Sequence, residues 1–500
     1  MSQRITATIE KADFIGRSVE LDALRRHGRG DKKSNALLLL AVPSVGASEL
    51  LKQTYDTLFH EQGETIPIYF AVEAADKSAK NCAWRFLNLV LEQTAAFRRN
   101  DAKIVENAPN FAELAELEDF EWAKRVAANC RIDAESGDDR ACVRNCLSAP
   151  FRVAASGTKF FVMIDDLHEA AYLTGEIDFF EELKSVYSQG SLPFVFAGDR
   201  RFLYGAAQTG TARLNGAEVL PLEPLDFTDA GLLTENLAWR LDVQINEQTR
   251  DLMGRQLAGN PTFIKFLLQS ARAKRVDLNS FGQVGKIYAD ELFGGALGGF
   301  YDAVFQKIAP NAKIQKSLVN LIYNALTVEK EKVSLEEWQS RVGLDDTDFY
   351  SATARLNAAE IIRTTSNLVE AMPENEVLSD YLTARFRLEI AAENRALVVG
   401  EMLSGFLKRA PQTMAKFYRQ SSAIGLRELL STFNQQETPL ALLDYSVFNE
   451  QLKGAETAEL SVGDAEKIRL PQIFYTAHTT AFYPPIENLT GKTRSAVALG

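Results

Sequence analysis

The sequence predicts an α/β fold organised on a parallel β-sheet. Apolar segments of strand length alternate with patterns of helical periodicity through the first half of the chain. The expected strands are Ala36–Val42, Ile66–Val72, Lys159–Asp166, Leu192–Ala197 and Ala217–Leu220. Near-continuous apolar runs are typical of parallel strands, because helices cover both faces of such a sheet. Acidic residues follow two of these strands, and open α/β sheets bind ligands at that edge.

Length and charge narrow the class of protein. A chain of 500 residues is expected to form more than one domain, since domains average roughly 100–200 residues. The net charge of −12 argues against a generally basic nucleic-acid-binding protein, although a local basic patch could still bind a phosphate backbone. The N-terminus lacks the apolar segment of a signal peptide, and no apolar run approaches the roughly 20 residues that span a bilayer. We therefore expect a cytoplasmic protein with no membrane segment.

The cysteines fit reduced thiols. They are Cys82, Cys130, Cys142 and Cys146. The Cys142-x3-Cys146 spacing lacks a second ligand pair or a nearby histidine, so the sequence predicts no zinc site.

The segment from Asn35 to Leu51, NALLLLAVPSVGASELL, predicts a strand, a turn of small residues and a helix. Backbone N–H groups of such a turn, together with the positive end of the helix dipole, can hold a phosphate group. The expected pattern is G-x-x-x-x-G-K-[ST], whose fixed positions are occupied here by Ala41, Gly46, Ala47 and Ser48. The first glycine and the lysine are therefore missing. The candidate nucleotide-binding residues of this segment are Pro43, Val45, Gly46, Ala47, Ser48 and Glu49.

Two later strands end in candidate catalytic residues. Asp165 would hold Mg²⁺, with the Ser48 hydroxyl as a further metal ligand, and Asp166 would orient the attacking water. The alternative is that these two acids only begin the next helix, since aspartate is a good N-cap. Asp199, at the end of the next strand, is the candidate that senses the terminal phosphate.

Two arginines follow Asp199 directly. Arg200 and Arg201 are candidates for an arginine finger, which would contact a phosphate in this subunit or a neighbouring one. The alternative is that they are solvated or form salt bridges at the start of a helix.

The remaining segments are predominantly helical. A charged insertion at about 81–155 carries no obvious chemistry. Ser18, Thr228 and Ser334 are expected to cap helices, and Phe293–Phe300 is predicted to be a flexible hinge. Three helices and a hairpin then follow in the order of a winged helix. They are Ile314–Leu326, Ser334–Val342, Thr347–Asn357, Ile361–Thr365 and Leu368–Ala371. The acidic residues Asp345, Asp346 and Asp348 make this module a poor surface for DNA, which favours protein contacts.

The region after residue 390 is expected to be α-helical, with separate helices and a loop-rich tail. The expected helices are Leu397–Lys408, Met414–Tyr418 and Ile424–Phe433. The tail begins near Ile468 and contains Pro471, Pro484 and Pro485.

The order of these motifs resembles that of AAA+ P-loop ATPases of the STAND type, the signal-transduction ATPases with numerous domains, over about residues 10–390. FIGR, with Gly16 and Arg17, is similar to the box that lies near the adenine in that family. LLLLAVPSVGASEL occupies the Walker A place, VMIDDLHEA the Walker B place, VFAGDRRF the sensor-1 strand and LPLEPLDFTDA the linker into the lid. AGNPTFIKFLL resembles the motif whose proline, here Pro261, touches the base.

The resemblance implies a domain order and a set of cofactors. It implies a P-loop NTPase core at 1–225, a helical lid at 226–308, a winged helix at 309–390 and a C-terminal α-helical region with a loop-rich tail at 391–500. ATP or ADP with Mg²⁺ would be the cofactors. Signal transduction and antiviral defence are associated with the family as a whole.

The departures from the Walker A pattern make enzymatic activity an open question. The lysine of the family neutralises the β- and γ-phosphates, and its replacement by Ala47 removes a charge-assisted contact. Ala41 adds a Cβ where backbone and phosphate approach closely. Two explanations fit: a naturally degenerate ATPase fold, or an engineered lysine substitution that blocks hydrolysis. Ala41 favours the first explanation, because an engineer who replaced the lysine had no need to replace the first glycine of the pattern with alanine as well.

Three functions remain open at this point. The leading hypothesis is a regulatory or scaffolding protein that acts through protein–protein contacts or self-assembly, with weak ATP binding and impaired hydrolysis. The second is a DNA-binding AAA+ ATPase, similar to origin-recognition or transposition-regulator proteins, that uses the winged helix. The third is an α/β protein with no nucleotide site.

Overall fold

The computed structural model describes residues 4–30, 34–117, 120–325 except 156 and 189, 333–371 except 343 and 366, and 375–432, followed by short strands up to residue 499. The chain forms two compact units, Met1–Leu407 and Lys408–Gly500. The first unit contains all the elements that position the candidate site.

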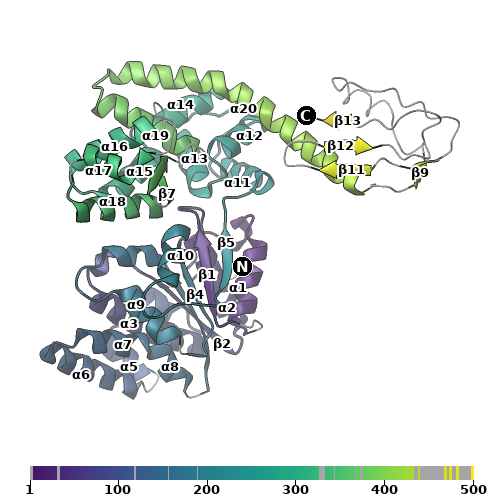
Figure 1. Ribbon diagram of the computed structural model, residues 1–500. Helices are drawn as coiled ribbons and strands as arrows, with labels where there is room; N and C mark the ends of the chain where they lie inside the picture. Colours follow the sequence, from purple (N-terminus) through teal and green to yellow (C-terminus); the bar gives the residue numbers. More distant parts are fainter. Residues whose placement is uncertain are drawn as a thin grey trace. The chain divides into compact units, whose positions relative to one another are not determined.

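A five-stranded parallel sheet lies among the helices of the N-terminal half of the first unit (Figure 1). Its strands are β1 (Ala36–Ala41), β2 (Thr65–Ala71), β3 (Lys159–Asp165), β4 (Phe194–Asp199) and β5 (Glu218–Leu222). They lie in the order β2-β3-β4-β1-β5. The α/β class and all five expected strands are confirmed, with their ends displaced by no more than two residues.

Burial explains the apolar runs. Every residue of β3 after Lys159 is buried, whereas the edge strand β5 alternates between exposed and partly buried positions. The helices α2 (Ala47–Glu61) and α3 (Ala79–Arg99) pack against β2, and α10 (Arg200–Gln208) packs against β1 and β4. Continuous hydrophobicity therefore marks the central strands, which helices cover.

The strand register brings the candidate residues to one edge of the sheet. Ala41, the last residue of β1, pairs with Asp199 of β4 and with Leu222 of β5. Ala71 at the end of β2 pairs with Asp165 at the end of β3. The connection after β1 leads to β2 on one side, and the connection after β4 leads to β5 on the other. This reversal creates the crevice at which open α/β sheets bind ligands.

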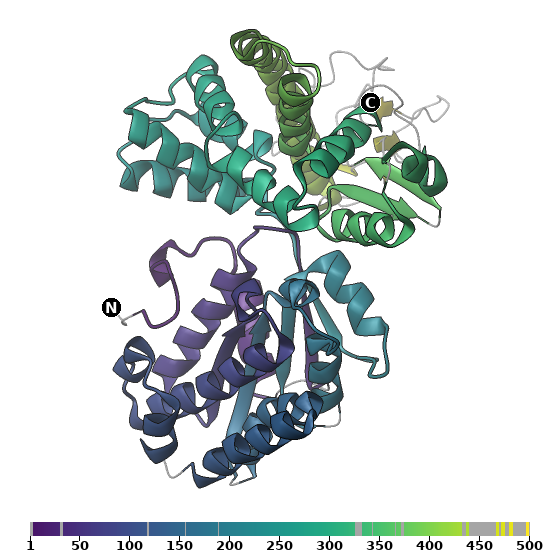
Figure 2. The same ribbon diagram turned by 90° about the vertical axis from the view of Figure 1, so that its left-hand side faces the viewer.

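The insertion between β2 and β3 is helical, as expected, and is drawn mainly in blue in Figure 2. After α3 it contains α4 (Lys103–Asn107), α5 (Phe111–Leu117), α6 (Glu121–Ser136), α7 (Asp139–Leu147) and α8 (Ala149–Ala154). Only a short turn separates α6 from α7, so these two helices pack against each other as a helical hairpin.

Five helices follow the sheet. They are α11 (Phe227–Arg240), α12 (Glu247–Gln256), α13 (Pro261–Lys274), α14 (Phe281–Leu292) and α15 (Ala296–Ile308). The predicted hinge at Phe293–Phe300 is wrong for its second half, which forms the first turns of α15. The Glu291 carboxylate accepts a hydrogen bond from the backbone N–H of Ala296 at 2.7 Å and so fixes the start of this helix. Gly298 serves close packing here, since a Cβ would lie 2.4 Å from the Leu292 carbonyl oxygen.

Two predicted helix caps are wrong for a common reason. Asp226, and not Thr228, caps α11, because its carboxylate accepts a hydrogen bond from the backbone N–H of Asp229. Helix α1 (Ser18–Gly28) includes Ser18 as its first residue and follows Arg17, which makes no capping hydrogen bond with its side chain. In both cases the helix begins earlier than its apolar periodicity indicates.

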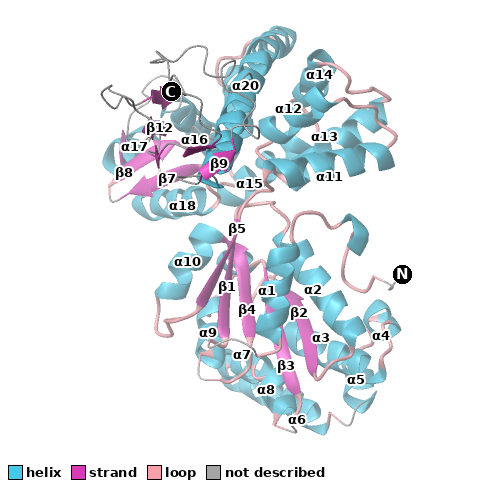
Figure 3. Ribbon diagram, turned by 90° about the vertical axis from the view of Figure 1, so that its right-hand side faces the viewer, coloured by secondary structure: helices cyan, strands magenta, loops and turns pink. Residues whose placement is uncertain are grey.

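A small antiparallel sheet and four helices follow (Figure 3). The elements are α16 (Ala312–Asn324), β6 (Val333–Ser334), α17 (Leu335–Val342), α18 (Asp346–Ala358), β7 (Ile362–Thr365), β8 (Leu368–Ala371) and α19 (Glu376–Glu389). The strands lie in the order β6-β8-β7. The predicted cap of α17 is confirmed, because the Ser334 hydroxyl accepts a hydrogen bond from the backbone N–H of Glu337 at 3.2 Å.

The C-terminal region differs from the expectation of several short helices. A single helix, α20 (Arg395–Thr432), runs through Pro411. Its predicted segments are joined by good helix formers such as alanine, arginine and glutamine, so propensity maintains the helix where apolar periodicity fails.

The predicted loop-rich tail also contains strands. In the second unit, β11 (Gln472–Tyr475), β12 (Thr480–Tyr483) and β13 (Val497–Leu499) form an antiparallel ladder, and β9 (Glu437–Pro439) pairs with β10 (Lys467–Arg469). Pro471, Pro484 and Pro485 lie outside the described residues. In the described part of the chain, none of the helices combines the length and the apolar character needed to cross a membrane.

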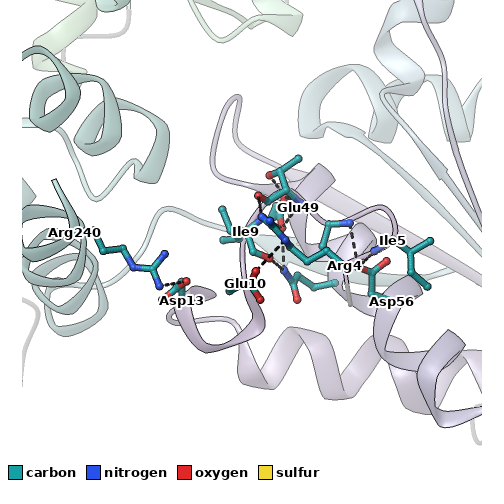
Figure 4. A network of polar contacts seen from close by, with 11 residues as sticks. Arg4, Ile5, Ile9, Glu10, Asp13, Glu49, Asp56 and Arg240 are labelled. Carbon is teal, nitrogen blue, oxygen red and sulfur yellow. Dashed lines mark hydrogen bonds and ion pairs between the residues drawn. The ribbon is translucent and has the colours of Figure 1, made fainter. Parts of the chain in front are cut away.

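Two carboxylates of α2 hold the N-terminal segment along that helix (Figure 4). Asp56, which is 7% exposed, accepts hydrogen bonds from the backbone N–H groups of Ile5, Thr6 and Ala7. Glu49 accepts hydrogen bonds from the N–H groups of the next two residues. Further along, Asp13 forms an ion pair with Arg240 of α11.

We predict that Asp56→Asn lowers the free energy of unfolding by about 1–3 kcal/mol, because an amide offers one acceptor oxygen in place of two. Asp22→Asn is the matched control, since Asp22 is 64% exposed and forms only a surface ion pair. Urea unfolding of both variants measures the difference. Equal stabilities would contradict the structural role of Asp56.

Candidate nucleotide-binding site

A cavity of about 680 Å³ lies at the carboxyl edge of the sheet. The loop between β1 and α2 forms one side, and the ends of β3 and β4 form another. Of the sequence candidates, Pro43, Val45, Gly46, Ala47, Ser48, Glu49, Asp165, Asp166, Asp199 and Arg200 line it. Folding therefore gathers most of the predicted nucleotide-binding and catalytic residues around one space.

The loop has the backbone geometry of an anion cradle. Gly46 adopts φ 95°, and α2 begins at the next residue. Ser44 adopts φ 65°, a left-handed conformation that is uncommon for residues other than glycine. The first intrahelical bond here runs from the Leu50 N–H to the Gly46 carbonyl, so the preceding N–H groups have no carbonyl partner within the helix. Such groups can bind an anion.

Three side chains donate hydrogen bonds to the loop carbonyls. Arg17 donates to the Val45 carbonyl at 3.2 Å and to the Glu223 carbonyl at 2.7 Å. The Thr262 hydroxyl donates to the Ser44 carbonyl at 2.8 Å, and the Asn260 amide donates to the Pro43 carbonyl at 3.4 Å. With its carbonyls bound in this way, the loop keeps its shape independently of a ligand.

The three remaining nucleotide-binding candidates lie behind the loop. Gly16, Arg17 and Pro261 are not among the described residues that line the cavity. Gly16 has φ 76° and packs against α11, where a Cβ would lie 2.6 Å from Asp229 Oδ2. The Pro261 ring is 3.9 Å from the position of a Cβ on Gly46. Arg17 and Pro261 therefore contact the loop, whereas Gly16 allows a close approach to α11.

Asn260 and Thr262 were missed by the sequence analysis. They flank Pro261, which was noticed only for its proline. The sequence feature that could have indicated them is a pair of hydrogen-bonding side chains at a helix N-terminus. This feature is common in helical proteins, so it does not point to a binding site.

Asp165 is buried and both its oxygens are engaged. It is 1% exposed, and its Oδ2 accepts a hydrogen bond from the Tyr69 hydroxyl at 3.0 Å. Its Oδ1 accepts a hydrogen bond from the Asp166 N–H at 2.8 Å. A metal ion would have to use the remaining lone pairs of a carboxylate that already has these donors. Tyr69 could have been found from its strand, because it lies opposite Met163 and Asp165 is the next residue on the same face.

Asp166 is in an unfavourable environment for a charge. Its φ is 53°, and burial together with the neighbouring Asp165 raises the pKa of its carboxyl to about 7. Burial also raises the pKa of Asp199. Asp166 precedes a short 3-10 helix, η3 (Leu167–Tyr172), but its side chain makes no capping hydrogen bond. The alternative of a simple helix cap therefore gains no support.

The cavity lining is acidic. It contains the carboxylates Glu49, Asp165, Asp166, Glu169, Asp199, Glu223 and Glu360, and the cationic side chains Lys52, Arg200 and Lys307. Lys307 forms an ion pair with Glu169. The Lys52 ammonium lies 5.7 Å from the centroid of the Tyr69 ring, and it comes from one turn below Ser48 on α2. Carboxylates therefore outnumber cationic groups around the space where phosphates would lie.

Both arginine-finger candidates make intramolecular contacts. Arg200 forms ion pairs with Glu360 and, at 2.8 Å, with Glu223. Arg201 donates to the carbonyl of Ile362 at 2.7 Å and to the side-chain oxygen of Asn357 at 3.1 Å. The start of α10 is thereby joined to the segment between α18 and β7. Arg200 therefore forms salt bridges, whereas Arg201 donates to uncharged oxygens.

Comparisons with known proteins give similarity at the level of structure. No family model and no curated protein matches the chain. The solved structures that resemble it include a Walker-type ATPase of Pyrococcus abyssi, with 12% identity, 76% of this chain and 98% of that chain covered, and a TM-score of 0.49.

Two further similar structures are a branch migration motor and a protein in complex with DNA. One is the RuvB Holliday junction branch migration motor of Thermotoga maritima, with 13% identity, 74% and 95% coverage and a TM-score of 0.36. The other is the ORC1 protein of Aeropyrum pernix in complex with DNA, with 14% identity, 74% and 92% coverage and a TM-score of 0.39. Because all three scores are below 0.5, we base the class of the fold on the sheet and its loop. These define an α/β fold with a five-stranded parallel sheet and a turn of small residues before α2.

We predict that Asp166→Asn stabilises the protein at pH 8 more than at pH 5. The raised pKa means that between about pH 4 and 7 the folded state binds a proton that the unfolded state has lost, so stability falls as the pH rises through this range. Removing the titrating group should cancel this loss, on the order of 1–3 kcal/mol. Thermal unfolding of Asp166→Asn and of the exposed control Asp22→Asn measures it. A gain that is the same at both pH values would contradict the prediction.

Proposed function

We propose that this chain is a degenerate AAA+ ATPase-fold protein of the STAND type, which acts as a regulatory or scaffolding component through protein–protein contacts or self-assembly. In this proposal it binds ATP weakly and its hydrolysis is impaired. One observation carries the proposal: a preformed phosphate loop has Ala47 at its lysine position and faces a cavity rich in carboxylates.

Electrostatics support weak nucleotide binding. The backbone N–H groups at the start of α2 would bind a phosphate, but the charge-assisted bond of a lysine is missing. Arg200 and Lys307 are paired with carboxylates, so a triphosphate would have to compete for them. In the cofactor-bound form, Ser48 and Asp165 would hold Mg²⁺, which would offset part of the negative charge. The side chains that line the cavity therefore suit a metal ion better than a triphosphate, because most of the charged ones are carboxylates.

We propose the domain order 1–225 for the NTPase core, 226–308 for the lid, 309–390 for a winged helix and 391–500 for the C-terminal region. The order of α16, α17 and α18 with the sheet β6-β8-β7 supports the winged helix. A regulatory role is supported by the contacts of Arg200 and Arg201. In this proposal these two arginines hold the winged helix to the core until a partner displaces it.

The four free cysteines suit the cytoplasm as the compartment.

The acidic start of α18 favours a protein partner over DNA. Asp345 caps this helix, and Asp346 and Asp348 lie in its first turn. Duplex DNA would meet like charge here. Binding of duplex DNA that weakens steeply with salt would favour the DNA-binding alternative instead.

We predict that the unmodified chain hydrolyses ATP no faster than a buffer blank, and that Ala47→Lys binds ATP with Mg²⁺ at least about tenfold more tightly than the unmodified chain. The new ammonium would restore the missing contact with the phosphates. Isothermal titration calorimetry and a phosphate-release assay measure the two quantities.

Ala47→Met is the matched control for this test, because it adds a side chain of similar length without the charge. An equal gain in affinity from methionine would show that packing, and not charge, limits binding. Turnover by the unmodified chain would contradict the proposed impairment of hydrolysis.

We further predict that Glu360→Arg releases the contact with α10, because it places a third cation beside Arg200 and Arg201. Hydrogen exchange of the backbone around 357–362 should become faster, and self-association in sedimentation velocity should increase. The double variant Arg200→Glu with Glu360→Arg restores the opposite charges and should return both measurements toward those of the unmodified chain. Unchanged exchange in the single variant would contradict a holding role for this ion pair.

A further inference from the structure

Three of the four cysteines gather at one point of the helical insertion, away from the nucleotide cavity. Cys130 lies on α6, and Cys142 and Cys146 lie one turn apart on the same face of α7. The turn between the two helices brings Cys130 to the other two. Their Sγ atoms all lie within 4.8 Å of one another. The sequence spacing gave only two ligands, and the third comes from the helical hairpin.

The distances suit a metal ion bound by thiolates. The Cys130 and Cys146 sulfurs are 3.8 Å apart. A tetrahedral ion with metal–sulfur bonds of about 2.3 Å holds its sulfurs roughly 3.8 Å apart. The cluster therefore needs only small side-chain shifts to bind an ion.

The environment of the cluster suits thiolates. All three cysteines are at most 5% exposed, so water competes little for the ion. Lys80 is close enough to interact electrostatically with Cys130 and Cys142. Its charge offsets part of the negative charge that three thiolates and a divalent ion would leave.

The remaining cysteine is an internal comparison. Cys82 on α3 is also fully buried, but it is not part of the cluster. Its neighbour is the carboxylate of Asp76, and burial raises its pKa. Cys82 therefore behaves as a small apolar residue of the core, whereas the other three sulfurs face one another.

We propose that Cys130, Cys142 and Cys146 form a binding site for a thiophilic metal ion of the Zn²⁺ or Cu⁺ type. Soft thiolate ligands select such ions over Mg²⁺ and Ca²⁺. Three protein ligands leave one position of a tetrahedral ion open, for a water molecule or for a carboxylate such as that of Asp139, which lies one turn before Cys142. The bound ion would join α6 to α7 and so stabilise the insertion.

The test uses the full chain, reduced and freed of metal. Competition with a chromophoric chelator, in separate titrations with Zn²⁺ and with Cu⁺, is expected to give one ion per chain for at least one of them. Thermal unfolding should shift to higher temperature when that ion is added. Cys142→Ser should weaken binding at least about tenfold and remove the thermal shift, while the matched control Cys82→Ser should keep both.

Substitution with Co²⁺ tests the unmodified chain, so the result does not depend on whether a variant folds. Thiolate-to-cobalt charge-transfer absorption with an intensity for three sulfurs would support the site. Two results of the binding experiments would overturn the proposal. One is that the reduced chain binds no ion, and the other is that binding survives simultaneous replacement of the three cysteines by serine. A purified chain with only two titratable thiols after unfolding would show a disulfide in place of the metal site and would overturn it as well.

Discussion

The buried guanidinium of Arg17 joins the loop after β1 to the segment after β5, and the shape of the candidate site depends on this contact. It is 6% exposed and binds two carbonyl groups, those of Val45 and Glu223. A guanidinium has several donors in a fixed plane, so one side chain can fix two backbone segments. With Asn260 and Thr262 it occupies the loop carbonyls, while the N–H groups at the start of α2 have no carbonyl partner within the helix.

The interactions that shape the loop differ from those that would attract a phosphate. Hydrogen bonds to backbone carbonyls hold the loop, and they require no nucleotide. The charge that attracts phosphates depends on single side chains, and here Ala47 provides none. The side chain at position 47 is therefore separate from the hydrogen bonds that hold the loop. Tyr69 adds to this effect, since its hydroxyl binds the carboxylate that would hold the metal ion.

Arg200 lines the cavity and also joins two segments of the chain through ion pairs. Its guanidinium lies at the edge of the cavity, yet both Glu223 and Glu360 are bound to it. An arginine finger needs a guanidinium that is available to a phosphate. In this chain the same group joins the start of α10 to a segment about 160 residues later.

The sequence by itself determined the parallel strands, the cap of α17 and the fact that the loop after β1 and the acidic ends of β3 and β4 meet at one edge of the sheet. Strand burial and the edge of the sheet follow from local apolar patterns, because the register of a parallel sheet brings all carboxyl ends together. Only the tertiary structure decided the roles of Tyr69, Asn260 and Thr262, the pairing of Arg200 and the meeting of Cys130 with Cys142 and Cys146. These depend on contacts between segments that are distant in the chain, and no local pattern encodes such distances.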